Sequence, residues 1–241
     1  MKPYNKQGTT KSEEVREMFD TIAPAYDRLN HILSFQIDKI WRARVVRFVE
    51  RHTPQTPQIL DLATGTGDLA IALSQRIKGS TLVGADPSRG MLDVAEKKVA
   101  AKGLSERLAL EVQSAESLSF EDERFDAVTA AFGVRNYSDL EGGIREMVRV
   151  TRSGGWVVVL EFSTPPNPVF RWFYNLYSRH ILPRIGAMLS SDREAYEYLP
   201  ASVEEFASRK EFLALMERVG LTNCRARSQS FGIAQIYVGQ K

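Results

Sequence analysis

The sequence predicts an α/β protein with a doubly wound, Rossmann-like sheet of seven strands and an antiparallel last strand. Strand and helix patterns alternate from residue 58 to residue 162, as in right-handed β-α-β units. Val157-Val158-Val159-Leu160 is a continuous apolar run, typical of a parallel strand that is covered on both faces. The last two predicted strands are joined only by Phe231-Gly232, a link short enough for an antiparallel pair.

Each element follows from an apolar pattern and the breaks that bound it. Strands are expected at 58–62, 80–86, 107–114, 125–131, 155–162, 222–230 and 233–239. Core helices are expected at 68–77, 89–102, 139–151 and 211–219. Before the first strand, Ser12 followed by two acids predicts a helix that runs through Phe19, and a second helix is expected from about Gln36 to Arg51.

The composition excludes several classes of protein. With 32 Lys and Arg against 30 Asp and Glu in 241 residues, the net charge of +2 gives no electrostatic footprint for nucleic acid. Cys224 is the only cysteine and the histidines number 3, which predicts a reducing cytoplasm and no metal site. The polar N-terminus lacks a signal core, and no run of about eighteen apolar residues predicts a membrane span.

The segment from Asp61 to Asp68, Asp-Leu-Ala-Thr-Gly-Thr-Gly-Asp, follows the first predicted strand and opens the next helix. Such a turn lies at the mouth of an open α/β sheet, where nucleotide-like ligands bind against backbone. Gly65 and Gly67 allow close approach because neither carries a Cβ. Asp61 and Asp68 place negative charge where a pyrophosphate would otherwise bind, which favours a cation without phosphate. S-adenosylmethionine, with its ammonium and sulfonium groups, meets this requirement.

A dinucleotide is the alternative ligand of this turn. Gly65-x-Gly67-x-x-Ala70 fits the relaxed dinucleotide fingerprint, and Asp86 follows about twenty residues later, as a ribose-binding acid would. Both cofactors contain adenosine, so Asp86 at the end of its strand suits the ribose of either. The acids of the turn favour the methyl donor. A tight turn with an N-capping acid is the purely structural alternative.

Four segments of the chain together resemble one family. They are Tyr26–Asn30, Asp61–Asp68, Phe132–Asn136 and Glu161–Ser163. Over nearly the whole chain the sequence resembles the UbiE/COQ5 methyltransferases. The resemblance implies the class I fold of S-adenosylmethionine-dependent methyltransferases. It also implies methylation of a ring carbon of a demethylmenaquinol or a polyprenyl benzoquinol, with S-adenosylmethionine as co-substrate and no metal.

The resemblance also carries over a donor site. It implies contacts from Thr66 in the glycine turn, from Asp86, and from Ser114-Ala115 after the third strand. A serine that some family members place beside the fourth strand is Ala131 here, so that contact is absent or comes from backbone. The chain also departs from the family's usual methionine, histidine and lysine-proline, at Leu29, Asp38 and Arg152-Ser153 respectively.

The reacting ring is expected beyond the fourth strand. Carbon methylation is a direct displacement, which needs the two reactants in line and the phenolate form of the quinol. Phe132-Gly133 permits close approach, while Arg135 and Asn136 can bind ring oxygens. Arg135 would lower the quinol pKa by stabilising the phenolate. A surface ion pair between Arg135 and Asp139 is the alternative.

A lid is expected over the donor and the ring. Tyr26 and Asn30 share a face if their segment is helical, with Asp27 beside them, but Pro24 makes an irregular turn equally compatible. The predicted regions are then a helical cap or lid (1–55), a donor-binding α/β core (56–163), an insertion over the substrate pocket (164–208) and a helix with a hairpin that completes the core (209–241).

The insertion contains an aromatic and basic segment, Val169–Tyr177. On a helix, Phe170, Phe173, Tyr174 and Tyr177 fall on one face. We expect the insertion to cover the ring pocket and to form an apolar mouth for the polyprenyl tail, in peripheral contact with the membrane surface. The tail keeps the substrate in lipid, since each buried CH₂ contributes about 0.8 kcal/mol. Packing of this helix against the sheet is the alternative.

The expected function is therefore methylation of demethylmenaquinol in the cytoplasm or at the inner face of the membrane. Methylation of 2-polyprenyl-6-methoxy-1,4-benzoquinol is the alternative substrate, and an NAD-binding dehydrogenase is the alternative class. A nucleic-acid base methyltransferase is disfavoured because no Asn-Pro-Pro-aromatic motif follows the fourth strand. Residues 199–202 and 232–234 resemble the family members of the menaquinone pathway more closely, which favours demethylmenaquinol. The sequence does not determine the oligomeric state, and a homodimer stays open.

Overall fold

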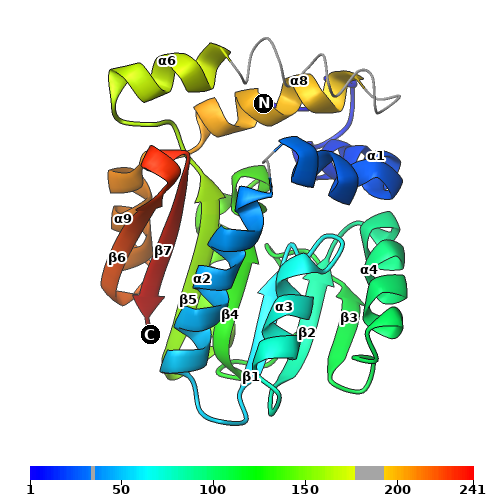
Figure 1. The fold of residues 1–241 in the computed structure, drawn as a ribbon, viewed down its shortest axis with the longest axis vertical. Helices are drawn as coiled ribbons and strands as arrows, with labels where there is room; N and C mark the ends of the chain where they lie inside the picture. The colour runs from blue at the N-terminus through cyan, green and yellow to red at the C-terminus, as the bar shows by residue number, and fades with distance from the viewer. Residues whose placement is uncertain (34–35, 177–192) are drawn as a thin grey trace.

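The computed structural model describes residues 1–33, 36–176 and 193–241, and the strands within them form one sheet (Figure 1). This sheet has seven strands in the order β3-β2-β1-β4-β5-β7-β6. The strands are β1 (Gln58–Leu62), β2 (Thr81–Asp86), β3 (Leu108–Val112), β4 (Phe125–Ala131), β5 (Thr151–Phe162), β6 (Thr222–Gln229) and β7 (Ala234–Gln240). β7 runs opposite to the other six strands of the sheet, which confirms the predicted doubly wound sheet with an antiparallel last strand.

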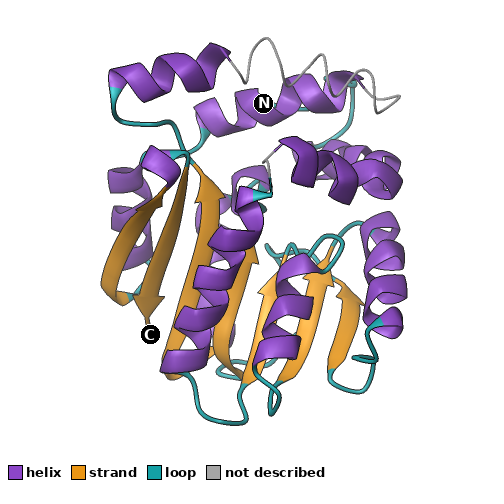
Figure 2. Cartoon of the chain, in the orientation of Figure 1, coloured by secondary structure: helices purple, strands orange, loops and turns teal. Residues whose placement is uncertain are grey.

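Helices cover both faces of the sheet (Figure 2). On one face lie α2 (Ile37–His52), α3 (Asp68–Arg76) and α4 (Arg89–Ala101), and on the other α5 (Leu140–Val150) and α9 (Arg209–Arg218). Leu73 and Val99 join the apolar cluster of the first face, and Phe212 joins that of the second. Because water is excluded from both faces, the central strands can be apolar throughout, as the run in β5 indicated.

The order of the strands reverses between β1 and β4. The chain runs outward from β1 to β2 and β3, and then returns to the other side of β1 to form β4. The loops that follow β1 and β4 therefore diverge at the carboxyl edge of the sheet. This reversal is where open α/β sheets bind their ligands.

Helix α1 (Lys11–Leu33) is longer than the segment predicted to end at Phe19, because it continues through Pro24. A proline within a helix removes one backbone hydrogen bond and costs about 3 kcal/mol by itself. Burial of Met18 and Ile22 in a cluster with Met91 of α4 offsets this cost. The helical alternative for residues 26–30 is the one that the structure adopts, although the side chain of Asn30 lies outside the described ones.

Two further helices, α6 (Pro168–Leu176) and α8 (Arg193–Glu205), lie beyond the carboxyl edge of the sheet (Figure 1). Tyr177 lies outside the described residues, as does the side chain of Phe173, so the predicted aromatic face can be followed only at Phe170 and Tyr174. No helix in the described ranges is long and apolar enough to cross a membrane.

The two C-terminal strands pair as an antiparallel hairpin, as predicted. The link between them is a short 3₁₀ turn, η3 (Ser230–Gly232), in which Phe231 has a positive φ of 59°. This conformation leaves the Phe231 side chain largely exposed, stacked on Phe170 of α6 at 4.2 Å between ring centroids.

Candidate active site

The glycine turn lies at the carboxyl edge of the sheet, between β1 and α3. Ala63, Gly65 and Gly67 have positive φ angles of 50°, 57° and 83°. A Cβ on Gly65 would meet no atom within 4 Å, so this position requires glycine for its backbone angle and leaves open space beside it. The N–H of Gly65 donates a hydrogen bond to Asp86 at 2.9 Å, which links the turn to the end of β2.

Asp61 lies beneath the turn. Its side chain is buried, with 1% of the residue exposed, and accepts hydrogen bonds from Thr64 Oγ1 at 2.7 Å and Thr129 Oγ1 at 2.6 Å. Burial raises the pKa of Asp61 to about 6. The carboxylate thus ties the turn to β4, whereas the sequence led us to expect it at the rim of the ligand site.

Asp68, the other acid of the turn, is matched by cations. Lys98 Nζ lies 2.5 Å from Asp68 Oδ1 and 2.6 Å from Asp27 Oδ2, and Arg42 lies 3.7 Å from Asp68. Thr66 Oγ1 donates to Asp27. The expectation that Asp68 offers free negative charge to a ligand is therefore wrong, because a lysine from α4 and an arginine from α2 lie against it.

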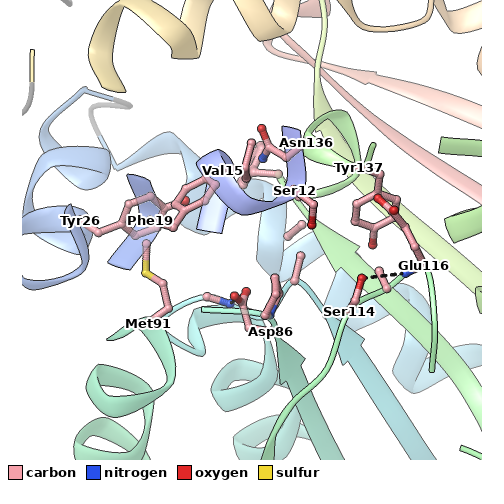
Figure 3. Close-up of a pocket in the computed structure, with 17 residues that line it drawn as sticks. Ser12, Val15, Phe19, Tyr26, Asp86, Met91, Ser114, Glu116, Asn136 and Tyr137 are labelled. Atoms are coloured by element: carbon pink, nitrogen blue, oxygen red, sulfur yellow. Dashed lines mark hydrogen bonds between the residues drawn. The ribbon is translucent and has the colours of Figure 1, made fainter. Parts of the chain in front are cut away.

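Asp86 occupies the predicted place at the end of β2. Its two carboxylate oxygens accept hydrogen bonds from the N–H of Ser88 and the N–H of Gly65, each at 2.9 Å. Burial raises the pKa of Asp86 to about 6. Ser88 rather than Asp86 caps α4, since its side chain accepts from the N–H of Met91. The carboxylate of Asp86 is therefore available to the pocket in front of it (Figure 3).

A pocket opens at this edge of the sheet, with a volume of about 680 Å³ that includes the solvent at its mouth. Its lining comes from α1, from the turns after β1 to β4, and from the start of α4. The lining residues are Ser12, Val15, Phe19, Tyr26, Ala63, Gly65, Asp86, Pro87, Met91, Ser114, Ala115, Glu116, Ala131, Phe132, Gly133, Asn136 and Tyr137. Among these described residues the charged side chains are Asp86 and Glu116, so the pocket has acids and no lysine or arginine. Such a lining favours a cationic ligand over a pyrophosphate.

Six of the eleven predicted site residues line this pocket: Tyr26, Gly65, Asp86, Ser114, Ala115 and Asn136. The other five, Asp27, Asp61, Thr66, Gly67 and Arg135, are not among its lining residues. Gly67 is the N-cap of α3, and a Cβ there would approach Ala95 to 3.3 Å. It therefore serves the packing of α3 on α4.

Helix α1 forms one wall of the pocket. Ser12, Val15 and Phe19 of its first turns line the cavity, and Phe19 packs edge-to-face on Tyr26. Asp20 fixes this wall, since its Oδ1 accepts hydrogen bonds from the N–H of Gly90 at 2.8 Å and from Ser88 at 2.6 Å. Ser12, Val15 and Phe19 were not predicted as site residues, although their i, i+3, i+7 spacing places them on one helical face.

At the end of β4 the chain forms a short 3₁₀ turn, η1 (Val134–Asn136). Arg135 is buried there and its Nη1 lies 2.8 Å from Glu161 Oε1, so the alternative of a surface pair with Asp139 is wrong. Burial by itself would lower the pKa of Arg135, but the charge of Glu161 contributes to a net rise. Arg135 Nε also lies 3.2 Å from Ser202 Oγ of α8.

Asn136 points into the pocket from the same turn. Its Oδ1 accepts a hydrogen bond from Tyr198 Oη of α8 at 3.1 Å, and Figure 3 shows its amide nitrogen on the side of the cavity. Glu116 and Tyr137 also line the pocket, but the sequence analysis missed them. Each directly follows a predicted site residue, and this adjacency was the signal that could have identified them.

The architecture is shared with solved methyltransferases. A methyltransferase from Thermotoga maritima, described as S-adenosylmethionine-dependent and a possible histamine N-methyltransferase, matches 93% of this chain and 99% of its own, with a TM-score of 0.62 and 17% identity. At this identity the likeness shows the fold alone. The sheet order and the acid-lined pocket beside a glycine turn are those expected of an S-adenosylmethionine-dependent methyltransferase.

The chain belongs to the ubiE/COQ5 methyltransferase family, whose model matches residues 7–241. It is 43% identical to the demethylmenaquinone methyltransferase of Bacteroides fragilis over all of this chain and 97% of the relative. It is 44% identical to the ubiquinone/menaquinone biosynthesis C-methyltransferase UbiE of Geobacter sulfurreducens over 97% of this chain and 90% of the relative. This membership decides against the dehydrogenase alternative.

Proposed function

We propose that this protein transfers the methyl group of S-adenosylmethionine to a ring carbon of demethylmenaquinol, which yields menaquinol. The acid-lined pocket at the carboxyl edge of the sheet carries this proposal, because it suits a cationic nucleoside without phosphate. The name of the Bacteroides fragilis relative supports the choice of ring. No metal is needed, because methyl transfer to an electron-rich carbon neutralises charge and creates no new anion.

In this proposal the donor lies across the ends of β1 and β2. Asp86 accepts the two ribose hydroxyls, since its carboxylate is held at the pocket wall by two backbone N–H groups. The open side of Gly65 lets the donor lie against backbone. Glu116 adds negative charge at the wall beyond β3. The positively charged donor is thus held without a basic side chain in the lining.

The quinol ring lies near Asn136 and Tyr26, on opposite walls of the pocket. The amide nitrogen of Asn136 donates to a ring oxygen, because Tyr198 already occupies its Oδ1. Arg135 acts mainly as a positioning residue: it holds η1 against β5 through Glu161 and against α8 through Ser202. Its charge, partly offset by Glu161, still favours the phenolate.

The substrate also requires contact with a lipid surface. Val169, Trp172 and Leu176 of α6 are 61%, 60% and 43% exposed, and Phe231 beside α6 is 69% exposed. We name these four residues the apolar end patch. Helix α6, which carries three of them and the exposed Arg171, lies beyond the carboxyl edge of the sheet, as does α1, which lines the pocket (Figure 1). An apolar surface with an adjacent cation suits an anionic bilayer, from which the prenylated quinol would enter.

Methyl transfer under reducing conditions tests the proposal. Labelled S-adenosylmethionine should methylate a short-chain demethylmenaquinol, and the benzoquinol substrate of ubiquinone synthesis should be methylated more slowly. Equal or faster transfer to the benzoquinol would reassign the substrate. Transfer to neither ring would overturn the proposal. Asn136→Leu should lower kcat by about tenfold or more with little change in the affinity for S-adenosylhomocysteine, because its contact is with the ring.

A further inference from the structure

Tyr137 lines the pocket but has no role in the methyl transfer proposed above. Its ring lines the pocket while only 9% of the residue is exposed. Within the described parts of the chain, its hydroxyl is fully buried and makes no hydrogen bond. A buried hydroxyl without a partner is unfavourable, so such a group at a ligand site indicates a partner supplied by the ligand.

The surrounding structure fixes where this ring points. On one side Gly143 of α5 packs so closely that a Cβ there would lie 2.5 Å from the ring. The carbonyl of Tyr137 accepts a hydrogen bond from Lys11 Nζ at 2.8 Å, which anchors the backbone. Figure 3 shows the hydroxyl directed toward the side of the cavity that holds Asp86 and Ser114. The ring therefore cannot turn toward α5.

The hydroxyl is suited to donate a hydrogen bond. Burial, and secondarily the nearby carboxylates of Asp86 and Glu161, raise the pKa of Tyr137 far above its ordinary value of 10.0. The group therefore keeps its proton at neutral pH. A partner with an unshared electron pair and no positive charge of its own, such as a heterocyclic nitrogen, can accept this hydrogen bond.

The nucleoside supplies such a partner at this place. Pro87, Ala115 and Tyr137 line the same pocket as Asp86, so a base attached to a ribose at Asp86 would lie within reach of them. We propose that the Tyr137 hydroxyl donates a hydrogen bond to a ring nitrogen of the adenine of S-adenosylmethionine. This inference rests on the proposed function. It adds a residue that reads the base, whereas Asp86 reads the sugar.

The test compares Tyr137→Phe with the native protein by calorimetry. S-adenosylhomocysteine should bind Tyr137→Phe about tenfold more weakly, the loss typical of one buried hydrogen bond. Three analogues, each with one of the base nitrogens N1, N3 or N7 replaced by carbon, identify the atom. One of them should bind the native protein about tenfold more weakly than the parent and show no further loss in Tyr137→Phe. The proposal would be overturned if Tyr137→Phe bound S-adenosylhomocysteine as tightly as the native protein does. It would also be overturned if the substitution weakened the binding of S-adenosylhomocysteine and of all three analogues by the same factor.

Tyr237→Phe is the matched control. The Tyr237 hydroxyl is also buried without a partner among the described residues, but it lies in β7 and outside the pocket lining. This variant should bind all ligands as the native protein does. The melting temperature of Tyr137→Phe without ligand should be unchanged or higher, because no bond of the free protein is lost. Failure of the native protein to bind S-adenosylhomocysteine at all would refute the proposed function as well.

Discussion

Lys98 Nζ of α4 lies 2.6 Å from Asp27 Oδ2 of α1, although 71 residues separate them in the chain. The same ammonium group lies 2.5 Å from Asp68 Oδ1, at the start of α3. One lysine therefore joins the helix that walls the pocket to the glycine turn. With Asp20 bound at the start of α4, α1 is fastened at two points along its length.

Replacing this lysine should loosen the wall. In Lys98→Met, the two acids lose their shared cation and repel each other, so α1 should detach more often. We expect S-adenosylhomocysteine to dissociate several-fold faster in stopped-flow experiments. Stability should fall by only about 1 kcal/mol, because the three side chains are 22–29% exposed and solvent screens the pairs. Lys97→Met, an exposed neighbour, is the control, and equal dissociation rates in both variants would contradict the prediction.

The turns after β1 and β4 are in close contact at Gly133. A Cβ on Gly133 would lie 2.3 Å from the Cβ of Ala63. Gly133→Ala should therefore destabilise the protein by about 2 kcal/mol and weaken donor binding, because the turns must separate. Ala63→Gly alone should change stability by less than about 1 kcal/mol, since relief of its positive φ offsets the added freedom of the unfolded chain.

The double variant is the decisive measurement for this contact. Ala63→Gly with Gly133→Ala removes the clash, so urea denaturation should show most of the lost stability restored. If the two changes are simply additive, the close approach of the turns is not the cause of the loss.

Asp61 should give stability a distinct pH dependence. Its pKa in the folded protein, about 6, lies above the ordinary value of 3.8. The folded state then binds more protons than the unfolded state between these values, so stability falls as pH rises from about 4 to about 6. The buried Asp86 acts in the same direction.

Urea denaturation across this range should show the fall, on the order of 3 kcal/mol for Asp61. In Asp61→Asn the slope should shift toward less loss of stability with rising pH, because the contribution of Asp61 is absent while those of all other groups remain. An unchanged slope in the variant would refute this account.

The apolar end patch should control binding to membranes. Trp172→Ser combined with Phe231→Ser should reduce sedimentation with anionic vesicles by about tenfold or more, since two largely exposed aromatic rings leave the interface. Val112→Ser removes an apolar side chain that is 54% exposed on the edge strand β3, and it should bind vesicles normally. The proposal of a lipid-facing patch would fail if both proteins sedimented equally.

Much of the fold could be predicted from local patterns. The apolar run in β5, the glycine turn and the short link before β7 each report on neighbouring residues. The seven strands and the antiparallel partner followed from them. Pro24 was the clearest local signal to mislead, because burial of side chains on both sides of it offsets one missing hydrogen bond.

By itself, the sequence determined the sheet, the expectation of a pocket at its carboxyl edge with Asp86 beside it, and the resemblance to a family that the full-length comparison then established. Tertiary structure alone decided which acids face the pocket. Lys98 neutralises Asp68, Thr64 and Thr129 enclose Asp61, and Glu161 holds Arg135, which is 26 residues away. The physical reason is that the neighbours of a charged side chain determine whether its charge is available to a ligand. Those neighbours come from distant segments of the chain, and no local sequence pattern shows which segments will come together.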